Sequence, residues 1–193
     1  MAKRILIIQG HPDPDGKRFG NALAASYAEG ARQGKHEVRL IDVAKLDFPI
    51  LRTKEDFERG APPESIREAQ NAITWADHLV IFFPLWLGTM PALFKAFLEQ
   101  VFRYGFAFGK PNGAMMGKLL TGKSARIVVT MGMPAFFYRF YFRAHGVKGL
   151  KRSILGLSGI KPIKESLIGM VEGSQAAREK WLAKMRRLGL EGK

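Results

Sequence analysis

Residues 78–101 read HLVIFFPLWLGTMPALFKAFLEQV, and this stretch decides the fold class. Its first part, residues 78–83, is a short apolar run typical of a strand that is buried on both faces. Pro84 ends this predicted strand, because proline cannot donate to the hydrogen-bond ladder. Pro91 then opens a predicted helix whose apolar residues recur at helical spacing as far as Val101. A buried strand followed by a loop and a helix is the repeating unit of an α/β protein.

The same alternation continues on both sides of this stretch. Further strands are predicted at residues 4–8, 36–41, 125–130 and 165–170, and further helices at 22–31, 64–75 and 175–188. A long polar connection with Pro49, Pro62 and Pro63 follows the second strand. Strands joined through helices favour a parallel sheet covered on both faces, so we expect a three-layer α/β sandwich with five strands. Because no internal repeat or low-complexity linker occurs, residues 1–193 are predicted to form one domain.

The composition excludes several kinds of site. The chain has no cysteine, which rules out a disulfide framework, a thiolate metal site and a cysteine nucleophile. No apolar run has the length of a membrane span, and the amino terminus reaches Gln9 and Gly10 before a secretory signal is complete. We therefore expect a soluble, cytoplasmic protein.

The net charge of +14 is concentrated in one third of the sequence. No acidic residue lies between Glu99 and Glu165, whereas twelve lysines and arginines do, so the rest of the chain is close to neutral. A field of one sign attracts anions such as nucleic acid, acidic lipid headgroups or phosphorylated small molecules. A solvated basic surface that serves only solubility is the alternative.

Ligands of parallel α/β sheets bind beyond the carboxyl ends of the strands, which here means after residues 8, 83 and 130. The first of these loops, residues 10–21, reads GHPDPDGKRFGN and leads into a helix. A helix amino terminus offers free N–H groups to a phosphate, and His11, Lys17 and Arg18 add polar or charge-assisted contacts. Neither a Walker loop nor GxGxxG is present. Since Asp, Pro and Gly also make ordinary turns, this loop alone is weak evidence.

The second loop, residues 84–91, is apolar and reads PLWLGTMP. Trp86, Leu87 and Met90 lie at the ligand edge, where their exposure is costly unless a flat aromatic group covers them. The alternative is that Trp86 is a core residue. Two prolines and Gly88 make the loop rigid enough to present backbone N–H and C=O groups to a heterocycle. The third loop, residues 130–134, reads TMGMP and is similar in character.

Three motifs carry a family resemblance: GHPDPDG near the amino terminus, FFPLWLGTMPALFKAFLEQVFRYGFAF in the middle, and TMGMP followed by Tyr138. In order and spacing they resemble the flavin-dependent NAD(P)H quinone dehydrogenases of the flavodoxin-like superfamily, over most of residues 3–145. The resemblance implies a flavodoxin-like sandwich with strand order 2-1-3-4-5 and a tightly bound FMN or FAD, between which no motif decides. It also implies a homodimer with flavin sites near the subunit interface, and two-electron reduction of quinones or related acceptors.

The resemblance assigns binding roles by position. Residues implied to hold the flavin phosphate and ribityl chain are His11, Arg18 and Phe19. Residues implied to line the isoalloxazine are Pro84, Leu85, Trp86, Leu87 and Gly88. Residues implied to contact the pyrimidine edge are Thr130, Met131, Gly132 and Met133. Phe106 and Phe108 match a segment that walls the site from the partner subunit. The family often carries Trp where this chain has Leu87.

Tyr138 and His145 resemble the family's tyrosine and histidine beside the flavin and are the candidate catalytic residues, although the spacing to His145 is one residue longer here. Tyr138 is expected to donate to the flavin or quinone oxygen, and His145 to exchange the proton that accompanies two-electron reduction. The alternatives are a packed aromatic residue and a solvated histidine on a basic helix. Backbone N–H groups of residues 130–133 are candidates for stabilising charge on the reduced ring. Turnover is expected to be ping-pong with NAD(P)H as co-substrate, NADPH being favoured because the basic segment attracts its extra phosphate.

Residues 136–145 interleave aromatic and basic side chains. A lid over the flavin is the preferred interpretation of residues 136–152, and a membrane or partner contact is the alternative, since Lys148, Lys151 and Arg152 would meet anionic headgroups. Nucleic-acid binding is not expected, because no recognised module accompanies the charge. The alternative to an enzyme is a flavodoxin-like regulatory or binding subunit that docks an acidic partner or a membrane surface.

Overall fold

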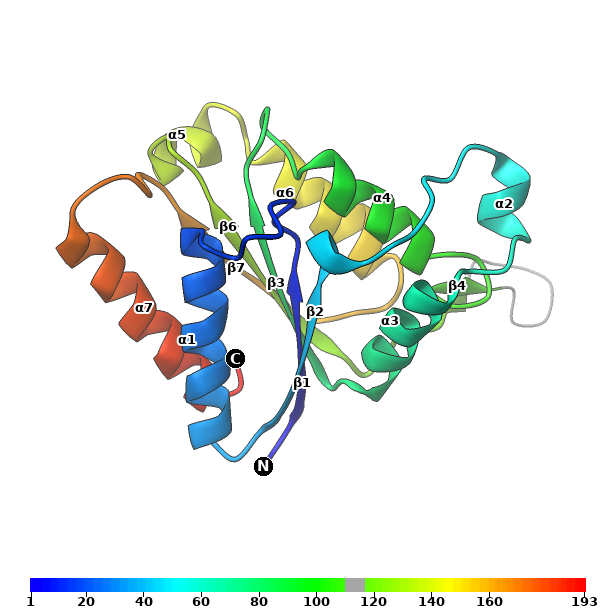
Figure 1. Ribbon diagram of the computed structural model, residues 1–193, viewed down its shortest axis with the longest axis horizontal. Helices are drawn as coiled ribbons and strands as arrows, with labels where there is room; N and C mark the ends of the chain where they lie inside the picture. Colours follow the sequence, from blue (N-terminus) through cyan, green and yellow to red (C-terminus); the bar gives the residue numbers. More distant parts are fainter. Residues whose placement is uncertain (110–116) are drawn as a thin grey trace.

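The computed structural model describes residues 1–109 and 117–193 and shows three layers built around one parallel sheet (Figure 1). The strands of this sheet are β1 (Arg4–Gln9), β2 (Glu37–Asp42), β3 (His78–Pro84), β6 (Ser124–Thr130) and β7 (Ile163–Ile168). They lie in the order β2-β1-β3-β6-β7, and every neighbouring pair is parallel. The expected five-stranded parallel sheet and its order 2-1-3-4-5 are confirmed.

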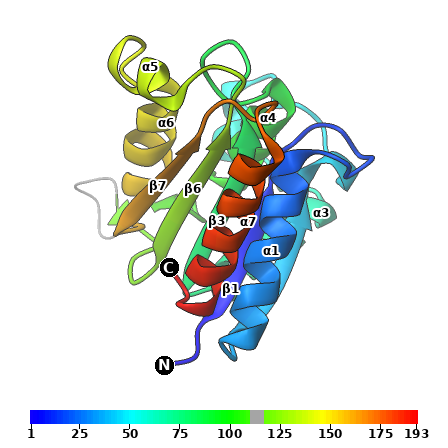
Figure 2. The same cartoon turned by 90° about the vertical axis from the view of Figure 1, so that its left-hand side faces the viewer.

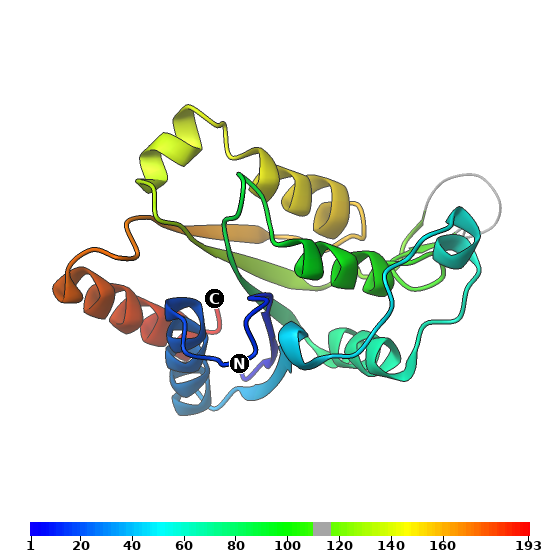
Figure 3. The same ribbon diagram turned by 45° about the horizontal axis from the view of Figure 1, so that its top comes forward.

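Helices cover both faces of the sheet. They are α1 (Phe19–Gln33), α2 (Lys54–Glu58), α3 (Glu64–Trp75), α4 (Ala92–Val101), α5 (Ala135–Phe140), α6 (His145–Gly149) and α7 (Gln175–Leu190). A 3₁₀ turn, η1 (Val43–Lys45), follows β2, and a π-helical segment, η2 (Leu150–Gly156), continues α6. A small antiparallel hairpin pairs β4 (Phe108–Gly109) with β5 (Gly117–Lys118). Figure 2 shows α1 and α7 together on one face, and Figure 3 shows α3, α4 and the α6–η2 segment on the other.

Strand β3 is apolar at successive positions because both of its faces are covered. Successive side chains of a strand point to opposite faces, so Leu79, Ile81 and Phe83 of β3 pack in the core beneath α3 and α4. Val80 and Phe82 of the same strand pack in the core beneath α1 and α7. All five side chains are buried, which is the pattern expected of a parallel sheet covered on both faces.

The two helices of one face approach closely because glycines allow it. A Cβ placed on Gly30 of α1 would lie 1.9 Å from the carbonyl oxygen of Arg186 in α7. A Cβ on Gly189 of α7 would lie 2.1 Å from the carbonyl oxygen of Tyr27. Both distances are far inside van der Waals contact, so neither position accepts a larger residue without separating α1 from α7.

Several segments differ from the sequence prediction. The first helix begins at Phe19 rather than at residue 22, and the polar connection after β2 contains η1 and α2. Residues 135–140 and 145–156 are helical as α5, α6 and η2, which the sequence analysis did not predict. The aromatic side chains of α5 are largely exposed, whereas α6 and η2 bury Val147, Leu150 and Leu155. Over the described ranges, no helix is both long and apolar enough to cross a membrane.

Candidate active site

The loops that follow β1, β3 and β6 meet at one edge of the sheet. Backbone hydrogen bonds tie each loop to the next strand: Gly10 N–H donates to the Phe82 carbonyl at 2.7 Å, and Leu85 N–H donates to the Thr130 carbonyl at 2.8 Å. Met131 N–H donates to the Ile168 carbonyl at 2.9 Å. The three predicted ligand loops are therefore held as one rigid surface beyond the carboxyl ends of the strands.

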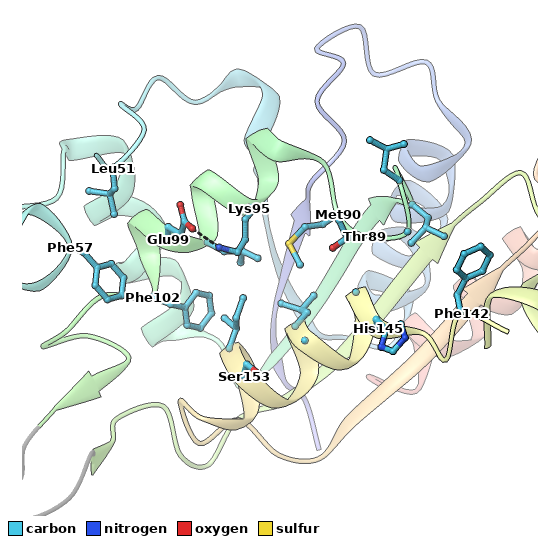
Figure 4. Close-up of a pocket in the computed structure, with 18 of the residues that line it drawn as sticks. Leu51, Phe57, Thr89, Met90, Lys95, Glu99, Phe102, Phe142, His145 and Ser153 are labelled. Atoms are coloured by element: carbon cyan, nitrogen blue, oxygen red, sulfur yellow. Dashed lines mark hydrogen bonds and ion pairs between the residues drawn. The ribbon is translucent and has the colours of Figure 1, made fainter. Parts of the chain in front are cut away.

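A cavity of about 1620 Å³ opens at this surface and continues between α4 and the α6–η2 segment (Figure 4). Among the predicted site residues, those that line it are Leu85, Leu87, Gly88, Met131, Gly132, Met133 and His145. The loop after β1 does not line this cavity, but its His11 ring lies edge-on to Trp86, with ring centroids 6.2 Å apart. The site thus combines a deep apolar groove with a polar loop beside its mouth.

The loop after β3 ends in a tight two-residue turn. Trp86 N–H donates to the Thr89 carbonyl at 2.8 Å, and Thr89 N–H donates to the Trp86 carbonyl at 3.0 Å. Leu87 and Gly88 between them have φ values of +48° and +80°, as in the type I′ turn of a hairpin. Leu87 is fully exposed and Trp86 half-exposed, as expected for a ligand-facing loop, whereas Met90 is buried. An exposed leucine in a left-handed conformation is strained, which marks this tip as a candidate contact surface.

The loop after β1 is ordered by its own polar groups. His11 Nδ1 accepts from Asp13 N–H at 3.0 Å, and the Asp13 carboxylate accepts from Arg18 Nε at 2.6 Å. Burial lowers the pKa of His11, so the neutral ring carries its proton on Nε2 and can donate from there. The Asp15 N–H and then the Arg18 guanidinium lower the pKa of Asp13. Arg18 directly precedes α1, while the Phe19 ring packs toward the α1–α7 core.

A phosphorylated flavin fits the residues at this edge. Gln9, the last residue of β1, is buried, and its Nε2 has no hydrogen-bond partner among the described residues. A Cβ on Gly20, in the first turn of α1, would lie 3.9 Å from that nitrogen. An anionic oxygen at the start of α1 would supply the acceptor that this donor lacks. On the cavity side, a Cβ on Gly132 would meet no atom within 4 Å, which leaves its backbone open to a ring.

Tyr138 contacts the site through the backbone of the turn. Its side chain is buried, and its hydroxyl donates to the Gly88 carbonyl at 3.2 Å and accepts from Val147 N–H at 3.4 Å. Burial raises the pKa of this phenol. The hydroxyl therefore braces the turn at Leu87 and Gly88 against α6, and a direct donation to flavin or quinone stays a prediction.

His145 lies on the wall of the cavity, at the first residue of α6 (Figure 4). Arg143 and Ala144 before it adopt left-handed φ values of +52° and +50°, which turn the chain from α5 into α6. Phe142 lines the cavity beside it, as the lid interpretation requires. His145 is exposed, so its side chain is accessible both to water and to a ligand in the cavity.

The far wall of the cavity comes from residues that sequence reasoning did not select. Leu51 and Phe57 reach it from the long polar connection, and Lys95, ion-paired with Glu99, lies on α4 (Figure 4). The buried guanidinium of Arg103 fixes this wall, since its Nη1 donates to the carbonyls of Asp56 and Gly60 at 3.0 and 2.7 Å. In the sequence, the available signal for this wall is that Leu51 and Phe57 are apolar residues within a charged connection. The neighbouring sequence does not indicate that they lie beside α4.

The remaining predicted positions are accounted for by the sheet and the core. Pro84 and Thr130 are the paired last residues of β3 and β6. Phe108 lines the cavity of its own chain, and Phe106 packs against the core beneath α4. Their predicted role as a wall toward a partner subunit stays a prediction.

A family model described as flavodoxin-like fold matches residues 3–188. The chain is 32% identical over 130 residues to an uncharacterized NAD(P)H oxidoreductase of Haemophilus influenzae, covering 66% of this chain and 63% of that protein. It is 26% identical over 200 residues to an FMN-dependent NADH:quinone oxidoreductase of Macrococcus caseolyticus, covering 92% and 90%. The solved NAD(P)H:quinone oxidoreductase from Methanothermobacter marburgensis superposes with a TM-score of 0.85 at 23% identity over 100% of both chains.

The extent of these matches differs between relatives. The match spans only 63% to 66% of the length of several curated relatives, the Haemophilus protein among them. The family model, in contrast, covers the chain almost from end to end and agrees with the observed strand order. The chain therefore belongs to the flavodoxin-like fold family.

Proposed function

We propose that this protein is a flavin-dependent NAD(P)H oxidoreductase that transfers two electrons to quinones or similar small acceptors. The observation that carries the proposal is the convergence of the loops after β1, β3 and β6 beside a deep apolar cavity. The names of the Haemophilus and Macrococcus relatives support the same chemistry. Bound flavin supplies the redox chemistry, and the protein positions it and its substrates.

FMN is the flavin that we propose. The matches to the relatives named FMN-dependent cover 83% and 92% of this chain. In this chain, Arg18, the start of α1 and the unpartnered Gln9 nitrogen would hold a single phosphate, while Leu85, Gly88 and Gly132 would lie against the ring system. FAD, the other flavin left open by the sequence, would require an additional pocket for adenine.

The residues around the cavity divide the remaining tasks. Of the backbone N–H groups in residues 130–133, that of Met131 is already used by the Ile168 carbonyl, which leaves those of Gly132 and Met133 as donors to the reduced ring. His145, on the cavity wall, would deliver and accept the proton that accompanies electron transfer. The apolar groove between α4 and η2 would receive the acceptor and exclude water.

A binding site shared by nicotinamide and quinone would determine the kinetic mechanism. If nicotinamide and quinone bind in turn against the same ring, turnover is ping-pong, and steady-state plots at several quinone concentrations are parallel. NADPH is proposed as the better donor, because the basic surface near the cavity attracts its extra phosphate. Intersecting plots, or equal kcat/KM for NADH and NADPH, would contradict these two points respectively.

A homodimer is proposed as the assembly. The cavity exceeds the roughly 300–1,000 Å³ of an ordinary small-molecule pocket, and its far wall carries the apolar side chains of Leu51, Phe57 and Phe102. A second copy would cover part of this groove and complete the site. Light scattering coupled to gel filtration tests the point, and a monomer at micromolar concentration would contradict it.

The deciding experiment is an absorption spectrum of the purified protein, recorded before and after anaerobic addition of NADPH. Flavin bands that bleach, with FMN identified by chromatography of the released chromophore, are the expected result. FAD in the extract would correct the choice of cofactor. A colourless protein that neither takes up added flavin nor oxidises NADPH would overturn the proposal in favour of a flavodoxin-like regulatory or binding subunit.

A further inference from the structure

The basic residues between Glu99 and Glu165 include two distinct groups. Several are used inside the fold: Arg103 and Lys123 donate to backbone carbonyls, Arg126 donates to Ser166 Oγ at 2.9 Å, and Lys151 pairs with Glu165 at 2.8 Å. The exposed bases along α5, α6 and η2 are Arg139, Arg143, Lys148 and Arg152. In the part of the chain that the structure describes, none of these four has a carboxylate within 4.0 Å. These four bases thus direct part of the unbalanced charge to solvent around α5, while Lys118, Lys161 and Lys164 are exposed elsewhere.

The same region exposes an unusual number of aromatic rings. Phe136 and Phe140 are 66% and 73% exposed and lie four residues apart on α5, so they share one side of the helix with Arg139. Phe137, Tyr141 and Phe142 pack on one another beside them, with the rings of Phe137 and Tyr141 stacked at 4.8 Å. We call residues 136, 137 and 139–143 the aromatic-basic face. Tyr138, which points inward, anchors it to the turn at Gly88.

The position of α5 makes this face accessible to a large flat partner. Figures 1 and 2 show α5 at the upper margin of the molecule, beyond the end of β6, and Figure 2 shows α6 directly below it. An exposed apolar patch rimmed by polar residues marks an interaction surface rather than a solvated one. The alternation of rings with guanidinium groups matches the interfacial region of a bilayer, where aromatic rings lie at headgroup level and bases meet anionic lipid.

A second copy of the chain fits this face poorly. In a twofold contact centred on this face, the face meets itself, so Arg139 and Arg143 of one copy would lie against the same bases of the other, with no acidic residue between positions 99 and 165 to neutralise them. Nucleic-acid bases stack on free ring faces, and here only Phe136 and Phe140 offer them within the face, since Phe137, Tyr141 and Phe142 pack on one another. Anionic lipid needs only exposed ring edges and unpaired cations.

We propose that the aromatic-basic face docks the protein reversibly on membranes that carry anionic lipid. Phe136 and Phe140 enter the headgroup region, and Arg139 and Arg143 pair with lipid phosphates. Because Phe142 of this face and the adjacent His145 also line the cavity, docking brings the mouth of the cavity to the bilayer surface. The inference does not depend on the proposed redox chemistry, since lipid binding requires neither flavin nor NAD(P)H.

Flotation of the full-length protein with lipid vesicles tests the proposal. We expect vesicles of phosphatidylcholine containing one quarter phosphatidylglycerol to bind the protein at least about tenfold more tightly than phosphatidylcholine alone, and we expect high salt to weaken binding. Absence of binding to either vesicle at low salt would overturn the proposal.

Double variants distinguish the contribution of the aromatic-basic face to vesicle binding from that of the overall positive charge. Phe136→Ser with Phe140→Ser is expected to weaken binding at least about tenfold, and Arg139→Gln with Arg143→Gln by about 25-fold. Matched controls are Leu40→Ser with Leu190→Ser, two exposed apolar residues elsewhere, and Lys180→Gln with Arg187→Gln, two exposed bases on α7. The controls are expected to bind like the wild type. Circular dichroism spectra verify that each variant is folded.

Three results would count against docking by this face. If both base variants weaken binding equally, the overall charge of +14 is responsible rather than the face. If Phe136→Ser with Phe140→Ser converts a dimer into monomers in gel filtration, a second copy covers the face. If a single-stranded oligonucleotide competes with vesicles only when Phe136 and Phe140 are present, the partner is nucleic acid.

Discussion

The hydroxyl of Tyr138 donates a hydrogen bond at 3.2 Å to the carbonyl of Gly88, a residue 50 positions earlier in the chain. A Cβ on Gly146, two residues beyond Ala144, would lie 2.7 Å from the same carbonyl oxygen. These two approaches lock the start of α6 onto the turn that follows β3. A change in the aromatic segment is therefore transmitted directly to the backbone that would lie against the flavin.

Tyr138→Phe tests whether this hydroxyl positions the turn or acts on the substrate. Loss of the bond leaves a carbonyl without its donor, so we expect the free energy of unfolding to fall by about 1 kcal/mol and the Kd for FMN to rise several-fold. Tyr141→Phe, at an exposed tyrosine, should change neither quantity. An unchanged Kd combined with a large fall in kcat would assign Tyr138 the role of direct proton donor.

Leu87→Asn tests the strain at the tip of the turn. Leucine in the left-handed region costs about 1–2 kcal/mol, and asparagine tolerates that region better. We expect the free energy of unfolding of the variant to be about 0.5–1 kcal/mol higher than that of the wild type. For a chain of this size, this difference raises Tm by about 1–4 °C. The KM for quinone should rise, because an apolar contact is lost. The control Leu40→Asn, in strand β2, should not stabilise the protein. A lower Tm for Leu87→Asn would contradict the inference that Leu87 is strained.

Arg18→Gln tests the phosphate site at the start of α1. Removal of a charge-assisted contact should raise the Kd for FMN about tenfold, while the Kd for riboflavin, which has no phosphate, should stay the same. Arg32→Gln removes an exposed base from the other end of α1 and should alter neither Kd. Equal weakening of FMN and riboflavin would mean that Arg18 supports the fold of the loop rather than the phosphate.

The buried ring of His78 is expected to make the free energy of unfolding depend on pH. Burial lowers the pKa of His78 to about 3, whereas the unfolded chain binds the proton near pH 6.5. Above pH 6.5 the ring is neutral in both states. Below pH 6.5 the unfolded state binds a proton on His78 that the folded state does not bind. The free energy of unfolding therefore decreases as the pH is lowered. Between pH 6.5 and 4.5 the expected loss is about 2 kcal/mol.

Urea unfolding of the wild type and His78→Gln over this pH range isolates that contribution. Other groups titrate in both proteins, and Asp77, whose pKa the Arg4 side chain lowers to about 2, stays ionised throughout. The variant should lose less stability than the wild type as the pH falls. Parallel stability curves for the two proteins would show that His78 is not responsible.

The strands and most helices were predictable because their signals are local. After Arg4 and His78, the runs at residues 5–8 and 79–83 are apolar at every position, as expected of a strand covered on both faces. The loops after residues 8, 83 and 130 lie where a parallel sheet places its ligands. Helix α5 was missed because it leaves most of its apolar side chains exposed, which removes the periodicity that identifies a helix. In α6 and η2, by contrast, Val147, Leu150 and Leu155 are buried, so a helical signal was present there.

The sequence by itself determined the sheet, its covering helices, the three loops at its edge and the location of the charge, since each depends on short-range patterning. Only the tertiary structure decided that Tyr138 turns inward to Gly88, that Arg103 brings residues 51–57 to the far wall, and that Phe136 and Phe140 remain exposed on α5. Those outcomes depend on contacts between residues about 50 positions apart or on the absence of such contacts. Local propensity carries no information about either.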